Sequence, residues 1–172
     1  MAWLAGRTAR IVGESPAIAA ALGAQGARLV DHGPSDILVH VVAPSVVKPA
    51  HELSHTEWRA ALDAGLDQRF LLARDFAKAR REAGKGGAVL YVGAPEQALG
   101  SDHAAAAGGL SNLTKTLGVE WARDGIRVNA ILTCETGLTL ESGETLGNLA
   151  AYLVSDYAAY VTGAVMGIGP DD

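Results

Sequence analysis

Few residues of this 172-residue chain have types and spacing that could support catalysis or metal binding. His103 could act as an acid–base group, but it has no obvious partner and begins a predicted helix, where a polar residue is ordinary. His51 and His55 are spaced like two metal ligands on one helical face, yet no third ligand completes a motif. We therefore interpret both as loop histidines on a solvated surface and predict no metal site.

The single cysteine and the C-terminal tyrosines could also take part in chemistry or binding. Cys134 lies beside Glu135, but no histidine stands in an arrangement that would activate a thiol, so a small buried residue is the better interpretation. Tyr152, Tyr157 and Tyr160 are typical of packing or interface positions. From residue types alone, the sequence predicts no catalytic centre.

The elements that would position these residues alternate between short apolar runs and helical patterns. Such alternation predicts a parallel α/β sheet with helices on both faces. The expected strands are 9–12, 27–30, 37–42, 88–92, 127–131 and 164–168, and the expected helices are 16–26, 56–81, 103–123 and 146–157. Residues 94–102 and 133–142 are expected to be loop or irregular.

Three of the expected helices show clear sequence signals. Ser15 and Pro16 are a good N-cap and first helical residue. Thr56 can cap the second helix, whose apolar face is Trp58, Leu62, Leu66, Phe70, Ala73 and Ala77. In the third, Leu113, Leu117 and Trp121 line one face and Asp124-Gly125 ends the helix.

Only six residues, 31–36, separate the second and third expected strands. Six extended residues span about 20 Å, which leaves no room for a crossover helix, since such connections need roughly a dozen residues or more. The second strand is therefore either abbreviated at the sheet edge or not parallel.

Composition narrows the class of protein further. The chain fits one domain, 1–172, and 49% hydrophobic residues indicate a globular protein. A net charge of −5 without a basic stripe argues against a nucleic-acid partner. The lone cysteine fits a reducing compartment, and neither a signal segment nor an apolar run of membrane-spanning length is evident. We expect a cytoplasmic location.

Several strings together carry a family resemblance. LGVEWARDGIRVNAI is similar to TLAVEWAPDGIRVNAI, DILVHVVAPSVVKP to DILVNNAG…KP, and SDYAAYVTGAVMGIG to SDAASYVTGQVLPVDGG, all of the short-chain dehydrogenase/reductase family. The resemblance covers most of the chain in order. It implies a reduced Rossmann-like, doubly wound parallel sheet, in which the crossover block after the second strand and the substrate lid are deleted.

The same resemblance implies that the family's dinucleotide site is lost. The family's TGxxxGxG loop is shortened to Gly13-Glu14-Ser15, and the Glu14 carboxylate stands where phosphate charge would lie. The family's NNAG becomes residues 40–43, and its Pro-Gly after VNAI becomes Thr133-Cys134. We therefore predict no cofactor in this chain.

The family's catalytic tetrad is replaced as well. The resemblance places His103 at the tyrosine, Ala107 at the lysine, Ala94 at the serine and Gly65 at the asparagine. The family needs those four groups for proton transfer to and from a carbonyl oxygen, a contribution of about 10² to 10⁴ in rate. We predict no catalytic residue in this chain.

The sequence keeps the two surfaces through which this family usually assembles, namely helices 56–81 and 103–123 and the segment 146–168. The small residues 104–109 would also let a partner helix approach closely. The leading hypothesis is a non-catalytic subunit that stabilises or regulates an active, NAD(P)-dependent family member acting on a ketone, an alcohol or an acyl thioester. Two alternatives stay open: a diverged enzyme that uses the remaining cleft with His103, His40 or Cys134, and a homo-oligomeric binding protein.

Overall fold

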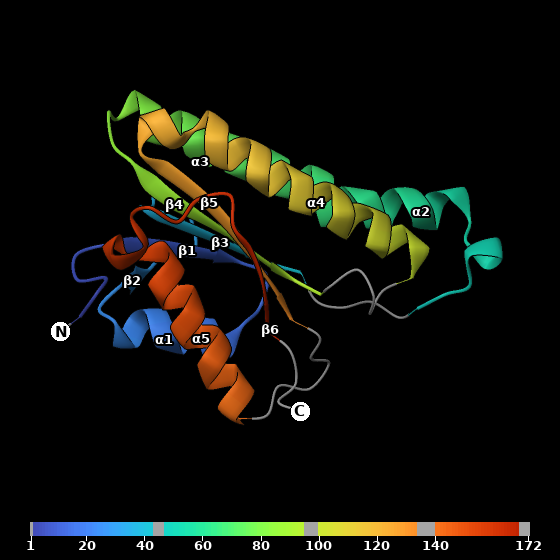
Figure 1. The fold of residues 1–172 in the computed structure, drawn as a ribbon, viewed down its shortest axis with the longest axis horizontal. Coiled ribbons are helices and arrows are strands. Elements are labelled where there is room, and N and C mark those ends of the chain that lie inside the picture. The colour runs from blue at the N-terminus through green and yellow to red at the C-terminus, as the bar shows by residue number, and fades with distance from the viewer. Residues whose placement is uncertain (1, 43–46, 95–99, 134–139, 169–172) are drawn as a thin grey trace.

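A parallel sheet forms the centre of the computed structural model, which describes residues 2–42, 47–94, 100–133 and 140–168 (Figure 1). Its six strands all pair in parallel, in the order β2-β1-β3-β4-β5-β6. The strands are β1 Thr8–Val12, β2 Arg28–Leu29, β3 Ile37–Val41, β4 Gly87–Gly93, β5 Ile126–Thr133 and β6 Val165–Ile168. The predicted α/β class and Rossmann-like sheet are confirmed.

Helices cover both faces of this sheet (Figure 1). The helices α1 Pro16–Ala24 and α5 Leu140–Val154 pack on one face, and α3 Gln68–Glu82 and α4 Ser101–Glu120 pack on the other. Strand residues alternate between the two cores, so that Val39 faces α1 and α5 whereas Leu38 faces α3 and α4. Among the described residues, no helix is both long enough and apolar enough to span a membrane.

The second strand is abbreviated but parallel, which settles the alternative that the sequence left open. The strand β2 keeps only Arg28 and Leu29, both exposed, and pairs with β1 at the edge of the sheet. Hydrogen bonds hold the end of the short segment between β2 and β3 against β1. The backbone N–H and the Oγ1 hydroxyl of Thr8 donate to Asp36 Oδ2 at 2.8 and 2.9 Å. The direct path from β2 to β3 thus needs no crossover helix.

The long helix expected over 56–81 is three consecutive helical segments. The α2 helix, His55–Leu62, is capped by Ser54 rather than Thr56, since Ser54 and Glu57 form a reciprocal capping box. A π-helical turn, η2 Asp63–Asp67, follows and leads into α3. His55 is therefore a helical residue and not a loop histidine.

One side chain of α3 differs from its predicted orientation. The predicted apolar face included Phe70, but Phe70 is 39% exposed whereas its neighbour Arg69 is only 2% exposed. The buried face of α3 is Arg69, Ala73, Phe76, Ala77 and Arg80, so Phe70 lies outside it. Ala73 and Ala77 are buried as predicted.

Other element boundaries differ from the predictions by a few residues. The helix expected over 103–123 begins at Ser101 and ends at Glu120, before the 3₁₀ turn Ala122–Asp124. The predicted stop is confirmed, because Gly125 adopts the left-handed conformation with φ +69°.

The C-terminal boundaries shift as well. The last helix, expected over 146–157, already begins at Leu140 and ends at Val154. Thr133, expected in an irregular segment, ends β5. Cys134 and Glu135 lie outside the described residues.

Candidate functional site

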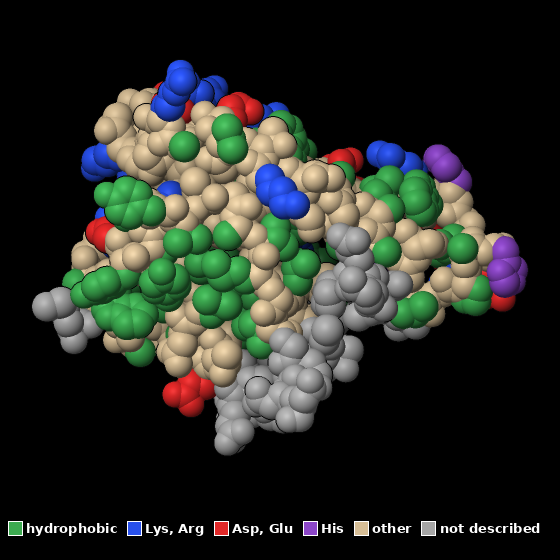
Figure 2. All heavy atoms as spheres, in the orientation of Figure 1, with side chains coloured by type: hydrophobic (Ala, Val, Ile, Leu, Met, Phe, Trp, Pro, Cys, Tyr) green, Lys and Arg blue, Asp and Glu red, His purple; other side chains and the backbone are tan. Residues whose placement is uncertain are grey.

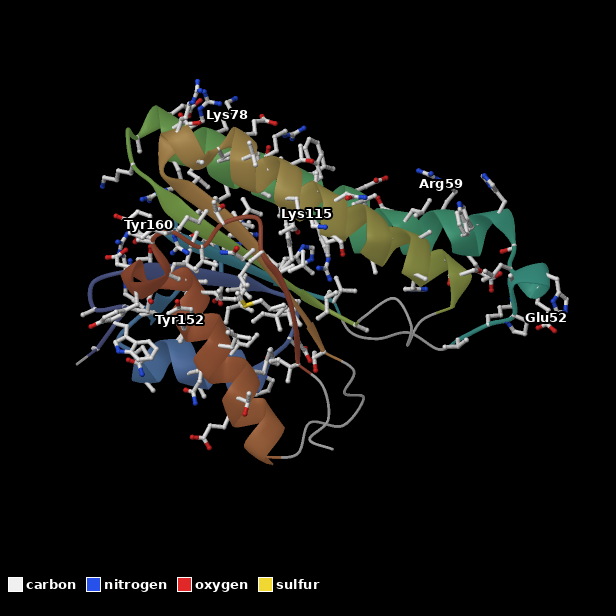
Figure 3. All side chains as sticks on the ribbon, in the orientation of Figure 1. Glu52, Arg59, Lys78, Lys115, Tyr152 and Tyr160 are labelled. Atoms are coloured by element: carbon white, nitrogen blue, oxygen red, sulfur yellow. The ribbon has the colours of Figure 1, made fainter. Side chains whose placement is uncertain are left out.

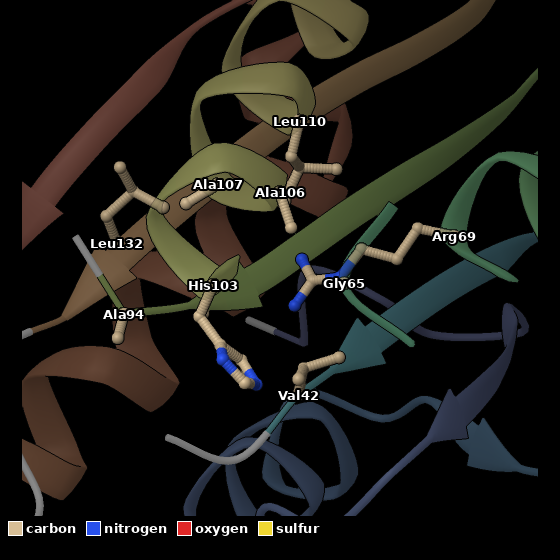
Figure 4. Close-up of a pocket in the computed structure, with 10 residues that line it drawn as sticks. Val42, Gly65, Arg69, Ala94, His103, Ala106, Ala107, Leu110 and Leu132 are labelled. Atoms are coloured by element: carbon tan, nitrogen blue, oxygen red, sulfur yellow. The ribbon is translucent and has the colours of Figure 1, made fainter. Parts of the chain in front are cut away.

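The four positions that the sequence resemblance assigns to the tetrad lie together in one pocket of about 40 Å³ at the carboxyl end of β4 (Figure 4). Gly65 comes from the π turn, Ala94 directly follows β4, and His103 and Ala107 lie one turn apart on α4. The remaining wall consists of Val42, Arg69, Gly93, Ala106, Leu110 and Leu132. The fold therefore brings together four residues that are far apart in the sequence.

His103 is the only one of those four residues with a polar side chain. Its Nδ1 atom lies 3.1 Å from Oδ1 of Asp102, which is ion-pair distance, although the two atoms lack the alignment of a hydrogen bond. Burial raises the pKa of the Asp102 carboxyl, but its contacts with His103 outweigh burial and hold that pKa below its usual value. The expectation that His103 has no partner is thus wrong, since its sequence neighbour is the partner.

Arg69 is the functional candidate that sequence reasoning missed. Its guanidinium projects into the pocket between α4 and Val42 (Figure 4). One nitrogen, Nη2, donates to the Val92 carbonyl oxygen at 2.9 Å, and the Tyr91 ring lies 5.8 Å from Cζ. Burial lowers the pKa of Arg69 to about 10, so the guanidinium is still charged at pH 7. The only signal in the sequence is an arginine within the helical stretch LDQRFLL.

His40 is a second buried basic side chain near this pocket. It lies in β3 between Val12 of β1 and Tyr91 of β4 and is 5% exposed, and its Nδ1 has no hydrogen-bond partner among the described residues. Burial, and then the charge of Arg69, lower its pKa to about 4. His40 is therefore neutral at pH 7.

The backbone is tightly packed at the end of the sheet where this fold binds nucleotides. In doubly wound sheets the ligand crevice lies where the strand order reverses, here between β1 and β3. Gly13, with φ +87°, lies so close to Val41 that an added Cβ would be 2.1 Å from the Val41 carbonyl oxygen. Ser15 accepts a hydrogen bond from the Ile18 N–H at 3.4 Å, which confirms the predicted N-cap and occupies a donor that a phosphate would use.

The other candidate histidines and the C-terminal tyrosines do not line this pocket. His51 and His55 are exposed, His51 in the 3₁₀ turn Ala50–Glu52. Among the described residues, no group of three metal-binding side chains comes together. Figure 3 shows Tyr152 and Tyr160 on the α5 side of the molecule. Tyr152 packs against the core there, while Tyr160 is fully exposed.

Two outer surfaces carry exposed apolar side chains. Phe70 and Leu71 of α3 and Val119 of α4 are 39%, 42% and 78% exposed, and a groove of about 510 Å³ runs between these helices. Figure 2 shows further hydrophobic side chains over α5 and the turn after it, where Trp3 and Tyr157 meet edge to face. The small residues of α4 also serve a contact within the chain, because Gly109 faces Leu66.

Residues 15–142 match the family model described as enoyl-(acyl carrier protein) reductase. The chain is 30% identical to cis-4-hydroxycyclohexanecarboxylate dehydrogenase of Sinomonas cyclohexanicum, over 80% of this chain and 66% of that protein. It is 32% identical to (2S)-[(R)-hydroxy(phenyl)methyl]succinyl-CoA dehydrogenase subunit BbsC of Thauera aromatica, over 78% of this chain and 62% of that protein. The chain thus matches just under two thirds of the length of both relatives.

Among solved structures, the fold is similar to a putative 2-deoxy-D-gluconate 3-dehydrogenase from Agrobacterium tumefaciens that holds bound NADP. The two share 24% sequence identity and a TM-score of 0.83, with 96% of each chain covered. At this identity the likeness concerns the fold alone.

Proposed function

Because the chain belongs to the short-chain dehydrogenase/reductase family, we propose that it is a non-catalytic subunit of that family. In this role it assembles with a catalytically active member and stabilises or regulates it. The active partner supplies the NAD(P) site and oxidises an alcohol or reduces a ketone, with hydroxyacyl thioesters as one substrate class.

The observation that carries this proposal is the chemistry of the pocket formed by the four tetrad positions. Gly65, Ala94 and Ala107 contribute no group that can hold or transfer a proton. A proton relay from a tyrosine to a carbonyl oxygen needs a donor and a nearby cation that lowers its pKa. Arg69 supplies a cation, but the tyrosine position holds His103, which is paired with Asp102.

The crevice between β1 and β3 supports the same conclusion for the cofactor. Gly13 approaches Val41 closely, and the Ser15 cap occupies the Ile18 N–H, one of the donors that a pyrophosphate would use. Glu14 is exposed beside that cap, where its charge would repel a phosphate. A partner with an intact cofactor loop would supply what this chain lacks.

The exposed apolar side chains support assembly. Val119, Phe70 and Leu71 lie on the outer surface of the α3–α4 pair, and β6 is an edge strand of the sheet. Exposed large apolar side chains on two neighbouring helices are a feature that protein–protein contact surfaces share. One relative, BbsC, is itself described as a subunit of a dehydrogenase, so an assembly role has a parallel among similar proteins.

Co-purification tests this proposal. The tagged chain, co-expressed with each intact paralogue of the same genome, should elute with one of them as a hetero-oligomer and raise its thermal stability or specific activity. If the chain elutes as a monomer and binds none of the paralogues, the proposed role is rejected.

The alternative is a diverged enzyme or ligand-binding protein that uses the remaining pocket. The Asp102–His103 pair favours this alternative, because a carboxylate beside a histidine is an arrangement that acid–base enzymes use. Calorimetric titration of the isolated chain with NAD(H) and NADP(H), together with a screen against alcohols and ketones, separates the two functions. Saturable nucleotide binding with turnover would favour the enzyme, whereas the subunit proposal expects neither.

A further inference from the structure

Arg69 carries a buried positive charge without a counter-charge among the described residues. Arg69 is 2% exposed. The one hydrogen bond described for its guanidinium runs from Nη2 to the carbonyl oxygen of Val92. The atoms Nε and Nη1 are buried and have no hydrogen-bond partner in the part of the chain that the structure describes. The other buried arginine, Arg80, differs in this respect, because it pairs with Asp36 at 2.8 Å.

A buried charge in this state is destabilising, because the protein has removed water from the guanidinium without replacing its hydrogen bonds. Burial lowers the pKa of Arg69 only to about 10, so deprotonation does not relieve the cost at neutral pH. The nearby basic side chains His40 and His103 cannot compensate a positive charge, whereas a bound anion can.

The pocket in front of Arg69 has the shape and lining for a small anion. Figure 4 shows the guanidinium at the centre of the pocket, with His103 as the other polar side chain. The facing wall is aliphatic, formed by Ala106, Ala107, Leu110 and Leu132. The cavity of about 40 Å³ is large enough for a few non-hydrogen atoms and too small for a nucleotide.

We propose that this pocket binds a short-chain monocarboxylate, whose two oxygens accept the free N–H groups of Arg69 and whose alkyl group contacts the alanine and leucine wall. A planar carboxylate matches the fork of an arginine. A single guanidinium balances one negative charge, so a phosphate or sulfate dianion would stay partly uncompensated. The proposal does not depend on a partner subunit.

The test uses the whole chain and compares sodium acetate, propionate and isobutyrate with sodium chloride at equal ionic strength and with neutral acetamide. Saturable binding by calorimetry and a rise in melting temperature are expected for the carboxylates alone. Arg69→Met should weaken carboxylate binding at least tenfold and should itself be at least as thermostable as the unliganded wild type, because it removes an unpaired charge.

A second variant keeps the charge and fills the space. Ala107→Leu should abolish carboxylate binding while Arg69 is intact, whereas Val119→Leu, on the exposed side of the same helix, should bind like the wild type. The proposal is overturned if chloride or acetamide acts like acetate, if Arg69→Met binds as well as the wild type, or if no carboxylate binds.

Discussion

Gly65 and Ala106 touch so closely that position 65 has no room for a side chain. A Cβ carbon added to Gly65 would lie 2.8 Å from the Cβ of Ala106, closer than carbon atoms pack in proteins. The contact joins the π turn to α4. An asparagine, which the sequence resemblance assigns to this position in the family, would not fit at position 65 unless α4 shifted.

This contact predicts a stability difference between two glycine-to-alanine substitutions. Gly65→Ala should lower the free energy of unfolding by about 1–3 kcal/mol, because a methyl group is forced into a filled space. Gly23→Ala is the matched control, since Gly23 is also helical and an added Cβ meets nothing within 4 Å. It should be neutral or stabilising by up to about 1 kcal/mol. Urea unfolding measures both, and equal effects would refute the close contact.

Restoring three of the four family groups should not restore catalysis. The variant Ala94→Ser, His103→Tyr, Ala107→Lys introduces the serine, the tyrosine and the lysine at the pocket and leaves Gly65, because position 65 has no room for an asparagine. It should show no NAD(P)H-dependent reduction of ketones above background, because the new lysine would lie near the fixed charge of Arg69 and because we propose that this chain binds no dinucleotide. Circular dichroism would establish that the variant is folded. Measurable turnover would mean that the cofactor binds after all.

The pH dependence of stability should contain a step from His40. Its pKa is about 4 in the folded chain against 6.5 for an unperturbed histidine, through burial first and then Arg69. Between these values the unfolded state binds the proton and the folded state does not. Stability should therefore fall as the pH drops from about 6.5 to 4, by on the order of 2 kcal/mol once screening by solvent is allowed for.

The variant His40→Gln isolates this step, because it removes the titrating group and leaves the carboxylates of the chain unchanged. Urea unfolding at pH 7, 6, 5 and 4.5 should give a smaller loss for the variant than for the wild type. Identical pH profiles would show that His40 is not buried as described.

The proposed interface on α3 and α4 predicts a selective loss of assembly. Val119→Glu should prevent co-purification with an active paralogue, because a charge would enter an apolar contact. The folding of the chain should be unchanged, since Val119 is 78% exposed. Leu29→Glu is the control, because Leu29 is exposed on β2, at the opposite edge of the sheet from β6. If Leu29→Glu prevents assembly and Val119→Glu does not, the interface includes β2 and not this part of α4.

Most of the sheet could be predicted from the sequence because its determinants are local. Buried strands appear in the sequence as apolar runs, and Gly125 ends the 3₁₀ turn that follows α4 through a conformation that glycine adopts easily. The positions of Gly65, Ala94, His103 and Ala107 followed from family strings, and the structure places all four in one pocket.

What the sequence did not predict depends on contacts between distant segments. The π turn arises within an ordinary helical pattern. In α3 after it, Arg69 is buried and Phe70 is exposed. A prediction from apolar periodicity counts only apolar side chains, so it selected Phe70 rather than Arg69 as the buried residue. The Asp102–His103 pair was missed because the helix was expected to begin at His103 rather than at Ser101.

Native mass spectrometry tests whether this chain works as a subunit beside an active relative. The tagged chain is co-expressed with an intact paralogue, and the purified complex is weighed without denaturation. We expect a hetero-oligomer that contains both chains, with NAD(P) retained by the paralogue. A lone chain that carries its own dinucleotide and turns over substrate would contradict it.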